Sequence, residues 1–157
     1  MFMKRSRIYV DTSVIGGCFD PEFDTWSRGL IEDLRAGRFR LVLSDVTATE
    51  IERAPIQVRE LHAELVPFAE ILPITEEALI LLEKYEAHGV LDARFRNDML
   101  HIALATTAEV DVLVSWNFQH IVRLDKIQQF NGINLEFGYK PLAIYSPREV
   151  TTYEREE

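Results

Sequence analysis

Four polar residues that lie far apart in the chain carry side chains suited to a hard divalent cation: Asp11, Glu50, Asp98 and Asn117. Mg²⁺ and Mn²⁺ prefer carboxylate, carbonyl and water oxygens. A cation held in this way polarises a phosphoryl oxygen and lowers the pKa of a bound water, which can then attack phosphorus. Carboxylates gathered without a cation would repel one another, so such a group indicates a metal site or raised carboxyl pKa values.

These residues follow or lie within predicted secondary structure. Short β-branched and apolar runs predict strands at residues 7–10, 40–43, 70–74, 111–115 and 142–145, with the third at a sheet edge because of its proline. Apolar residues at helical spacing predict helices from about residue 24 to 36, from 45 to 54, and over 56–67, 76–89, 94–108 and 118–129. We expect residues 16–22 to form a loop and the tail from Thr151 to Glu157 to be frayed.

Alternating strands and helices predict an α/β fold with a mainly parallel sheet flanked by helices. The length of 157 residues fits one domain, whose core we expect to span about residues 7–145. Ligands of such sheets bind outside the carboxyl ends of the strands. Two polar clusters fall there, Asp11-Thr12-Ser13 and Ser115-Trp116-Asn117, so we expect the chemistry at this edge.

The composition restricts the function classes. A net charge of −9, from 17 basic and 26 acidic residues, argues against a protein that coats nucleic acid by bulk electrostatics. It leaves open an enzyme that reaches phosphate through a metal. The lone Cys18 cannot form an internal disulfide, and no apolar segment is long enough for a membrane span. We therefore expect a cytoplasmic protein with a buried or loop thiol.

Each acid also has a structural interpretation. Asp11 could end a strand and start a turn, and Asp98 could be favoured by the dipole of its helix. Glu50 could be solvated, with Glu52 as a rival for its role. Asn117, judged alone, is better suited to capping the short helix that is predicted to follow it than to binding metal.

Other residues with reactive or stacking side chains are expected to be structural. His101 and His120 lack the further His or Cys of a zinc set. We therefore expect His101 to make a local hydrogen bond within its helix, and His120 to be structural or to face the substrate. Trp116 is expected to pack against the sheet edge more readily than to stack a base. The basic stretch is interpreted as a solvated helix face; it comprises Arg28, Arg35, Arg38 and Arg40.

Four segments, in order, resemble the motifs of the PIN-domain family. Residues 7–14 resemble the opening strand that runs into Asp-Thr/Ser, and Ser44 followed by Glu50-Ile51 resembles the second motif. Residues 98–105 resemble the third, an Asp that opens a helix of small residues. Residues 112–118 resemble the fourth, a buried strand that ends in Ser/Thr, any residue, then Asp or Asn.

The resemblance implies a metal-dependent ribonuclease, which in bacteria and archaea is often the VapC-like toxin of a toxin–antitoxin pair. Asp11 and Asp98 would then bind Mg²⁺ or Mn²⁺ directly, and Glu50 would orient a metal-bound water or complete the acidic set. Three hydroxyls would support these acids by hydrogen bonds: Thr12, Ser13 and Ser115. The implied partners are an RNA substrate, an antitoxin protein and a second copy in a homodimer.

Asn117 departs from the family pattern, in which many members carry Asp at this position. Asn offers a carbonyl oxygen but has no charge and cannot act as a base. The alternative function is therefore a catalytically weakened PIN-fold module that binds RNA or a protein partner. An aspartyl-phosphate phosphatase is disfavoured because Ser13 stands where its second Asp would be, and no Gly-rich phosphate loop follows the first strand.

Overall fold

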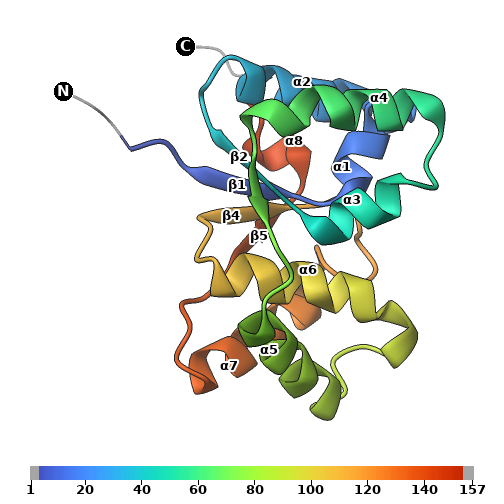
Figure 1. The fold of residues 1–157 in the computed structure, drawn as a ribbon. Coiled ribbons are helices and arrows are strands. Elements are labelled where there is room, and N and C mark those ends of the chain that lie inside the picture. The colour runs from blue at the N-terminus through green and yellow to red at the C-terminus, as the bar shows by residue number, and fades with distance from the viewer. Residues whose placement is uncertain (1–3, 154–157) are drawn as a thin grey trace.

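The sheet forms the centre of the computed structural model, which describes residues 4–153 (Figure 1). All pairings between neighbouring strands are parallel, in the order β3-β2-β1-β4-β5. The strands are Arg7–Val10 (β1), Arg40–Ser44 (β2), Glu70–Leu72 (β3), Val112–Val114 (β4) and Ala143–Tyr145 (β5). The predicted α/β fold with a parallel sheet is confirmed, and β3 lies at an edge as expected.

Helices cover both faces of the sheet (Figure 1). One layer contains Thr12–Gly17 (α1), Asp24–Arg35 (α2), Asp45–Ile51 (α3), Ile56–Leu65 (α4) and Pro147–Val150 (α8). The other contains Glu76–Ala87 (α5), Arg96–Thr107 (α6) and Leu124–Glu136 (α7). Short 3₁₀ turns follow α4 at Val66–Phe68 and precede α6 at Ala93–Phe95.

The two-residue period of β1 divides its side chains between the two layers. Ile8 and Val10 are buried in the cluster that includes α1, α2 and α4, whereas Tyr9 is buried in the cluster that includes α5, α6 and α7. Both faces of this central strand are therefore apolar, as expected for a buried parallel strand. Polar side chains of the edge must come from residues that follow the strand.

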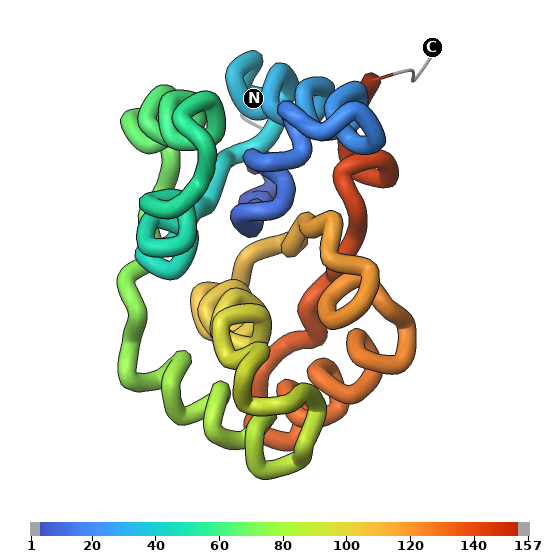
Figure 2. The backbone as a smooth tube through the Cα atoms, turned by 90° about the vertical axis from the view of Figure 1, so that its right-hand side faces the viewer, coloured from blue at the N-terminus to red at the C-terminus, as the bar shows by residue number. Residues whose placement is uncertain are grey.

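Parallel pairing brings the carboxyl ends of three neighbouring strands together. Tyr9 pairs with Val42 of β2, and Val10 pairs with Val114 of β4. The residues that follow β1 and β4 therefore lie side by side, at the point where the blue and orange segments approach in Figure 2. This is the edge at which we expected the site.

Two predicted boundaries are wrong. The loop expected over residues 16–22 begins later, because α1 extends through Gly17. Asp11 ends the strand and also caps this helix, since its side chain accepts from the backbone N–H of Val14. The helix predicted over 118–129 instead spans Leu124–Glu136. A turn precedes it, closed by Asn117, whose Oδ1 accepts the N–H groups two and three residues later.

The prediction of a frayed tail is wrong at its beginning. Thr151 is buried, and its hydroxyl donates to the buried Asp33 carboxylate of α2 at 2.8 Å. The backbone N–H of Thr152 donates to the same oxygen at 2.8 Å. These bonds tie residues 151–152 to α2, while residues 154–157 of the predicted tail lie outside the described part.

Cys18 is buried, and burial raises the pKa of its thiol to about 11. The thiol is therefore protonated at neutral pH, which agrees with its expected structural role. Within residues 4–153, no helix combines the length and apolar character that crossing a bilayer requires.

Close packing of α1 against the segment after β4 depends on Gly17. A Cβ atom placed there would lie 2.6 Å from Ser27 Oγ and 2.7 Å from Trp116 Nε1, although these two atoms already form a 2.8 Å hydrogen bond with each other. The Trp116 ring stacks on Phe23 at a centroid distance of 4.3 Å. Gly17 thus lets the indole lie against α1, next to Asn117.

We predict that Gly17→Ala lowers the free energy of unfolding by about 1–3 kcal/mol, because the added methyl group overpacks this contact. Gly16→Ala is the matched control: no atom lies within 4 Å of its added Cβ, so helix propensity should stabilise it by about 0.5 kcal/mol. Urea unfolding in a Trp26→Phe background, monitored by Trp116 emission, measures both effects. Equal stabilities for the two variants would contradict the packing argument.

Candidate functional site

Asp11 lies at the end of β1 with only 4% of its surface exposed. The hydroxyl of Ser13 donates to Oδ1 and that of Ser115 donates to Oδ2, each at 2.6 Å. Burial raises the pKa of Asp11, and the positive charge that His101 carries when protonated and the two hydroxyl bonds oppose this rise. The carboxylate is thus desolvated by the fold and held by donors from two strand ends.

The turns after β1 and β4 are joined by further hydrogen bonds. The backbone N–H of Trp116 donates to Ser13 Oγ at 2.9 Å, and the N–H of Asn117 donates to Ser115 Oγ at 2.9 Å. Each serine therefore accepts from the second turn while donating to Asp11. This reciprocal bonding fixes the relative position of the two polar clusters found in the sequence.

Glu50 lies at the penultimate position of α3, not early in its helix as expected. Its Oε1 accepts from the Thr12 hydroxyl at 2.6 Å and contacts His101 Nε2 at 2.7 Å. Burial alone would raise the pKa of this carboxyl, but interactions with His101 and the bond from Thr12 outweigh burial and lower it. Glu52, the rival acid, is exposed.

Asp98 lies in the first turn of α6 and faces the turn after β4. Its Oδ2 lies 2.9 Å from His120 Nδ1 and accepts from the Asn117 amide nitrogen at 3.3 Å. Asn117 therefore presents its NH₂ group to the acid, while its carbonyl oxygen closes the turn toward His120. In this conformation, the carbonyl oxygen expected to replace a carboxylate is already bonded to backbone.

The two histidines have larger roles than sequence reasoning gave them. The prediction of a local bond for His101 is wrong: its ring nitrogens contact Tyr9 of β1 and Glu50 of α3. His120 packs on the Phe95 ring at a centroid distance of 4.0 Å and contacts Asp98. The available signal for His101 was its place three residues after Asp98, which puts both on neighbouring parts of one helix face.

Trp116 packs as expected, whereas the prediction of one solvated helix face for the four arginines is wrong, because α2 ends at Arg35 and Arg40 lies in β2. Trp116 is buried against Phe23 and donates to Ser27. The arginines of α2 are largely engaged within the chain, since Arg28 donates to the carbonyl of Cys18 and Arg35 forms ion pairs with Glu32 and Glu64. Arg38 pairs with Asp33, and Arg40 is exposed.

The donor chemistry of this edge fits a hard cation, because it consists of carboxylate oxygens with hydroxyl neighbours. The acids do not form a ready cage. Among residues 4–153, no three His, Cys, Asp or Glu side chains are grouped so that they could hold a metal ion. A cation bound at this edge would therefore have to be held by one or two carboxylates and several waters.

Two hydrogen-bonded networks nevertheless contain the seven predicted site residues, five in one and Thr12 with Glu50 in the other. Asp98 bonds Asn117, which bonds Ser115, which bonds Asp11. Ser13 is joined to Asp11, and the neighbouring Thr12 connects Glu50. The fold thus assembles the residues that the sequence selected, while their catalytic and metal-binding roles stay predictions.

Several solved structures share this fold. VapBC2 from Rickettsia felis, bound to a DNA fragment from its promoter, superimposes with a TM-score of 0.58 and 13% sequence identity. The aligned part covers 89% of this chain and 98% of the VapBC2 chain. FitAcB from Neisseria gonorrhoeae superimposes with a TM-score of 0.59 and 18% sequence identity, over 89% of this chain and 97% of the FitAcB chain. VapBC-1 from nontypeable Haemophilus influenzae superimposes with a TM-score of 0.57 and 15% sequence identity, over 90% of this chain and 98% of the VapBC-1 chain.

These identities show a shared fold alone. No curated protein sequence matches the chain. The family model of the PIN domain, however, matches residues 8–122, which include all four acidic and amide positions of the candidate site. By this match, the chain belongs to the PIN-domain family.

Proposed function

We propose that this protein is a metal-dependent endoribonuclease, the toxin component of a toxin–antitoxin pair. PIN domains are generally nucleases. The observation that carries the proposal is the buried Asp11 carboxylate, joined through serine hydroxyls and Asn117 to Asp98. Packing alone requires no carboxylate at a strand end, and burying one is costly unless it is paired or binds a cation.

In the proposed reaction, water attacks a phosphodiester of RNA. Asp11 and Asp98 would hold Mg²⁺ or Mn²⁺, which when bound neutralises phosphate charge and makes a bound water more acidic. Glu50 would orient the attacking water, since its lowered pKa keeps it an ionised acceptor at neutral pH. Ser13 and Ser115 would hold the Asp11 carboxylate in one orientation.

We predict that the purified protein cleaves a labelled structured RNA with Mg²⁺ or Mn²⁺ and not with EDTA. Asp11→Asn and Asp98→Asn should each lower the cleavage rate by at least about a hundredfold, since even groups that only support metal ligands contribute 10–100-fold. Asp125→Asn, which removes an exposed acid paired with Arg123, is the matched control and should cleave normally. Metal-independent cleavage, or full activity without both acids, would refute the proposal.

Asn117 provides a second test of the site. We predict that Asn117→Asp tightens metal binding and raises the cleavage rate, because it adds a charge beside Asp98 while keeping the oxygen that closes the turn. Isothermal titration with Mn²⁺ and the same cleavage assay measure these changes. Unchanged affinity and rate would show that Asn117 does not limit the site. Binding of RNA or a partner without cleavage by any variant would support the weakened-module alternative.

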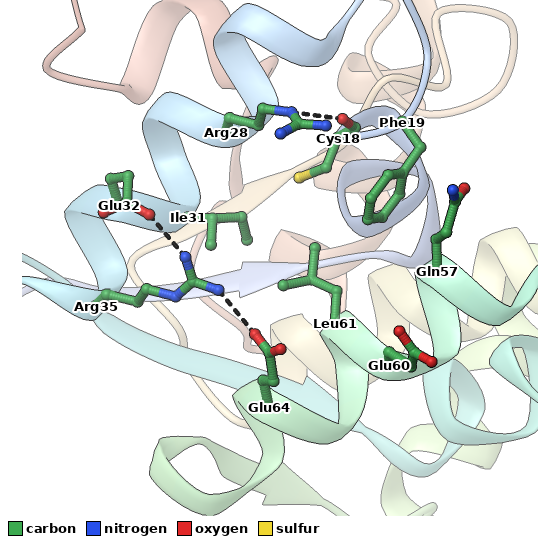
Figure 3. Close-up of a pocket in the computed structure, with 10 residues that line it drawn as sticks. All are labelled: Cys18, Phe19, Arg28, Ile31, Glu32, Arg35, Gln57, Glu60, Leu61 and Glu64. Carbon is green, nitrogen blue, oxygen red and sulfur yellow. Dashed lines mark hydrogen bonds and ion pairs between the residues drawn. The ribbon is translucent and has the colours of Figure 1, made fainter.

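A groove on the opposite side of α2 from the C-terminal segment suits a protein partner. It has a volume of about 530 Å³ and is formed by α2, α4 and the residues after α1 (Figure 3). Phe19, Ile31 and Leu61 supply apolar surface, and Arg35 bridges the rim by pairing with Glu32 and Glu64. We propose that an apolar-anchored segment of an antitoxin binds here.

Two observations support this occupant. The similar solved structures named above are complexes of toxins with antitoxins. The rim carries three glutamates and two arginines, which are Glu32, Glu60, Glu64, Arg28 and Arg35. Their sum is one negative charge. The groove therefore favours a segment that has a basic residue beside its apolar anchors.

We predict that Phe19→Glu weakens binding of the small protein encoded directly upstream by at least about tenfold, because it replaces an apolar contact with a charged group that must lose water on binding. Phe68→Glu changes a similarly exposed phenylalanine away from this groove and should bind normally. Calorimetry measures the affinity of both variants for this protein. Separately, light scattering of the free chain tests the homodimer that the family resemblance implies. Equal affinities for the two variants would place the partner elsewhere.

A further inference from the structure

A buried hydrogen-bonded relay runs behind the candidate site and ends on Glu50. The Tyr9 hydroxyl lies 2.7 Å from Ser44 Oγ and 2.5 Å from His101 Nδ1. The other ring nitrogen, Nε2, lies 2.7 Å from Glu50 Oε1. Tyr9, Ser44 and His101 are each at most 2% exposed, so no water replaces these contacts. The relay connects β1 and β2 through α6 to an acid of the site.

The direction of the relay follows from counting hydrogens. The backbone N–H of Thr47 donates to Ser44 Oγ, and among the described residues the Tyr9 oxygen is the one acceptor within reach of the serine hydrogen. A tyrosine keeps its proton at neutral pH, and its one hydrogen then goes to His101 Nδ1. The opposite direction would leave the buried Ser44 hydrogen without an acceptor among the described residues, which is costly.

Because Nδ1 accepts, the hydrogen of a neutral His101 lies on Nε2 and faces Glu50. We propose that His101 is a positioning residue for Glu50, held by Tyr9 in the neutral Nε2–H tautomer. This inference rests on the proposed nuclease function for the role of Glu50, while the tautomer itself can be measured without that function. In the other tautomer, a lone pair on Nε2 would face the carboxylate oxygen and repel it.

The relay gives Glu50 a defined orientation. Nε2–H and the Thr12 hydroxyl both donate to the same oxygen, Oε1, so the carboxylate is restrained from two sides. His101 lies one turn after Asp98 on α6. The same helix therefore presents one acid directly and orients a second through its histidine.

The test combines two measurements on four variants. ¹⁵N NMR of histidine-labelled protein at neutral pH, without metal or RNA, reads the protonation of each ring nitrogen, and loss of one signal in His101→Gln assigns His101. Steady-state RNA cleavage gives kcat and KM for Tyr9→Phe, His101→Gln and His101→Leu. Tyr85→Phe is the matched control, because Tyr85 is also fully buried and donates at 2.5 Å to a buried side chain, Asn134.

We expect His101 of the wild type to be protonated on Nε2 alone and to become a mixture of tautomers in Tyr9→Phe. The kcat of Tyr9→Phe should fall about tenfold and that of His101→Leu about a hundredfold, with KM unchanged. His101→Gln should recover most of the activity, because its amide nitrogen can donate to Glu50 from the position of Nε2. Tyr85→Phe should lower Tm as Tyr9→Phe does but keep wild-type kcat.

Three results would overturn the inference: a hydrogen on Nδ1 of the wild type, an imidazolium with both nitrogens protonated, or a kcat for Tyr9→Phe equal to that of Tyr85→Phe. Absence of cleavage by the wild type would refute the nuclease function instead. The NMR measurement would then still support or overturn the relay, so the two failures are distinguishable.

Discussion

A carboxylate buried at the end of a strand is stable only where donors or a cation satisfy its oxygens, and Asp11 imposes this requirement on the whole sheet edge. Ser13 and Ser115 each donate to one oxygen. Ser115 can do so only because β4 lies beside β1 in parallel register. The pairing of distant strands, the start of α1 and the position of the turn after β4 therefore all meet at one side chain.

Both helical layers contribute to this edge in different ways. The layer with α1 and α3 supplies the Thr12 hydroxyl and Glu50, which are bonded to each other. The layer with α6 supplies Asp98 and His101, and His101 reaches across to Glu50. The edge is thus a place where polar groups from two otherwise apolar cores are linked, and each acid has a partner from a different element.

Local sequence signals predicted the elements that local physics determines. The β-branched and apolar runs predicted all five strands to within two residues at each end. The polar residues that follow β1 and β4 indicated the edge at which the candidate site lies. The first helix was missed because two glycines in succession resemble a loop. Burial of Gly17 beneath Trp116 compensates for its low helix propensity, and that contact joins residues about a hundred positions apart.

The candidate site was predictable in its acids and not in its histidines. Asp11 and Asp98 follow recognisable patterns, whereas the partner of His101 depends on how α6 crosses the sheet. The sequence also left the bonding of Asn117 open. The structure shows that its carbonyl oxygen closes a turn, which is also why the following helix begins several residues later than the apolar spacing indicated.

The order in which the site residues are synthesised has a consequence for the nascent chain. Asp11 leaves the ribosome early, but Ser115 and Asn117 follow only after about three quarters of the chain has been made. Until then β1 has no β4 beside it, and Asp11 lacks one of its two hydroxyl donors. Contacts between segments so distant in sequence also form slowly. A chain of this topology therefore carries its acids through most of translation without a completed site, so whatever chemistry it performs begins only once synthesis is nearly finished.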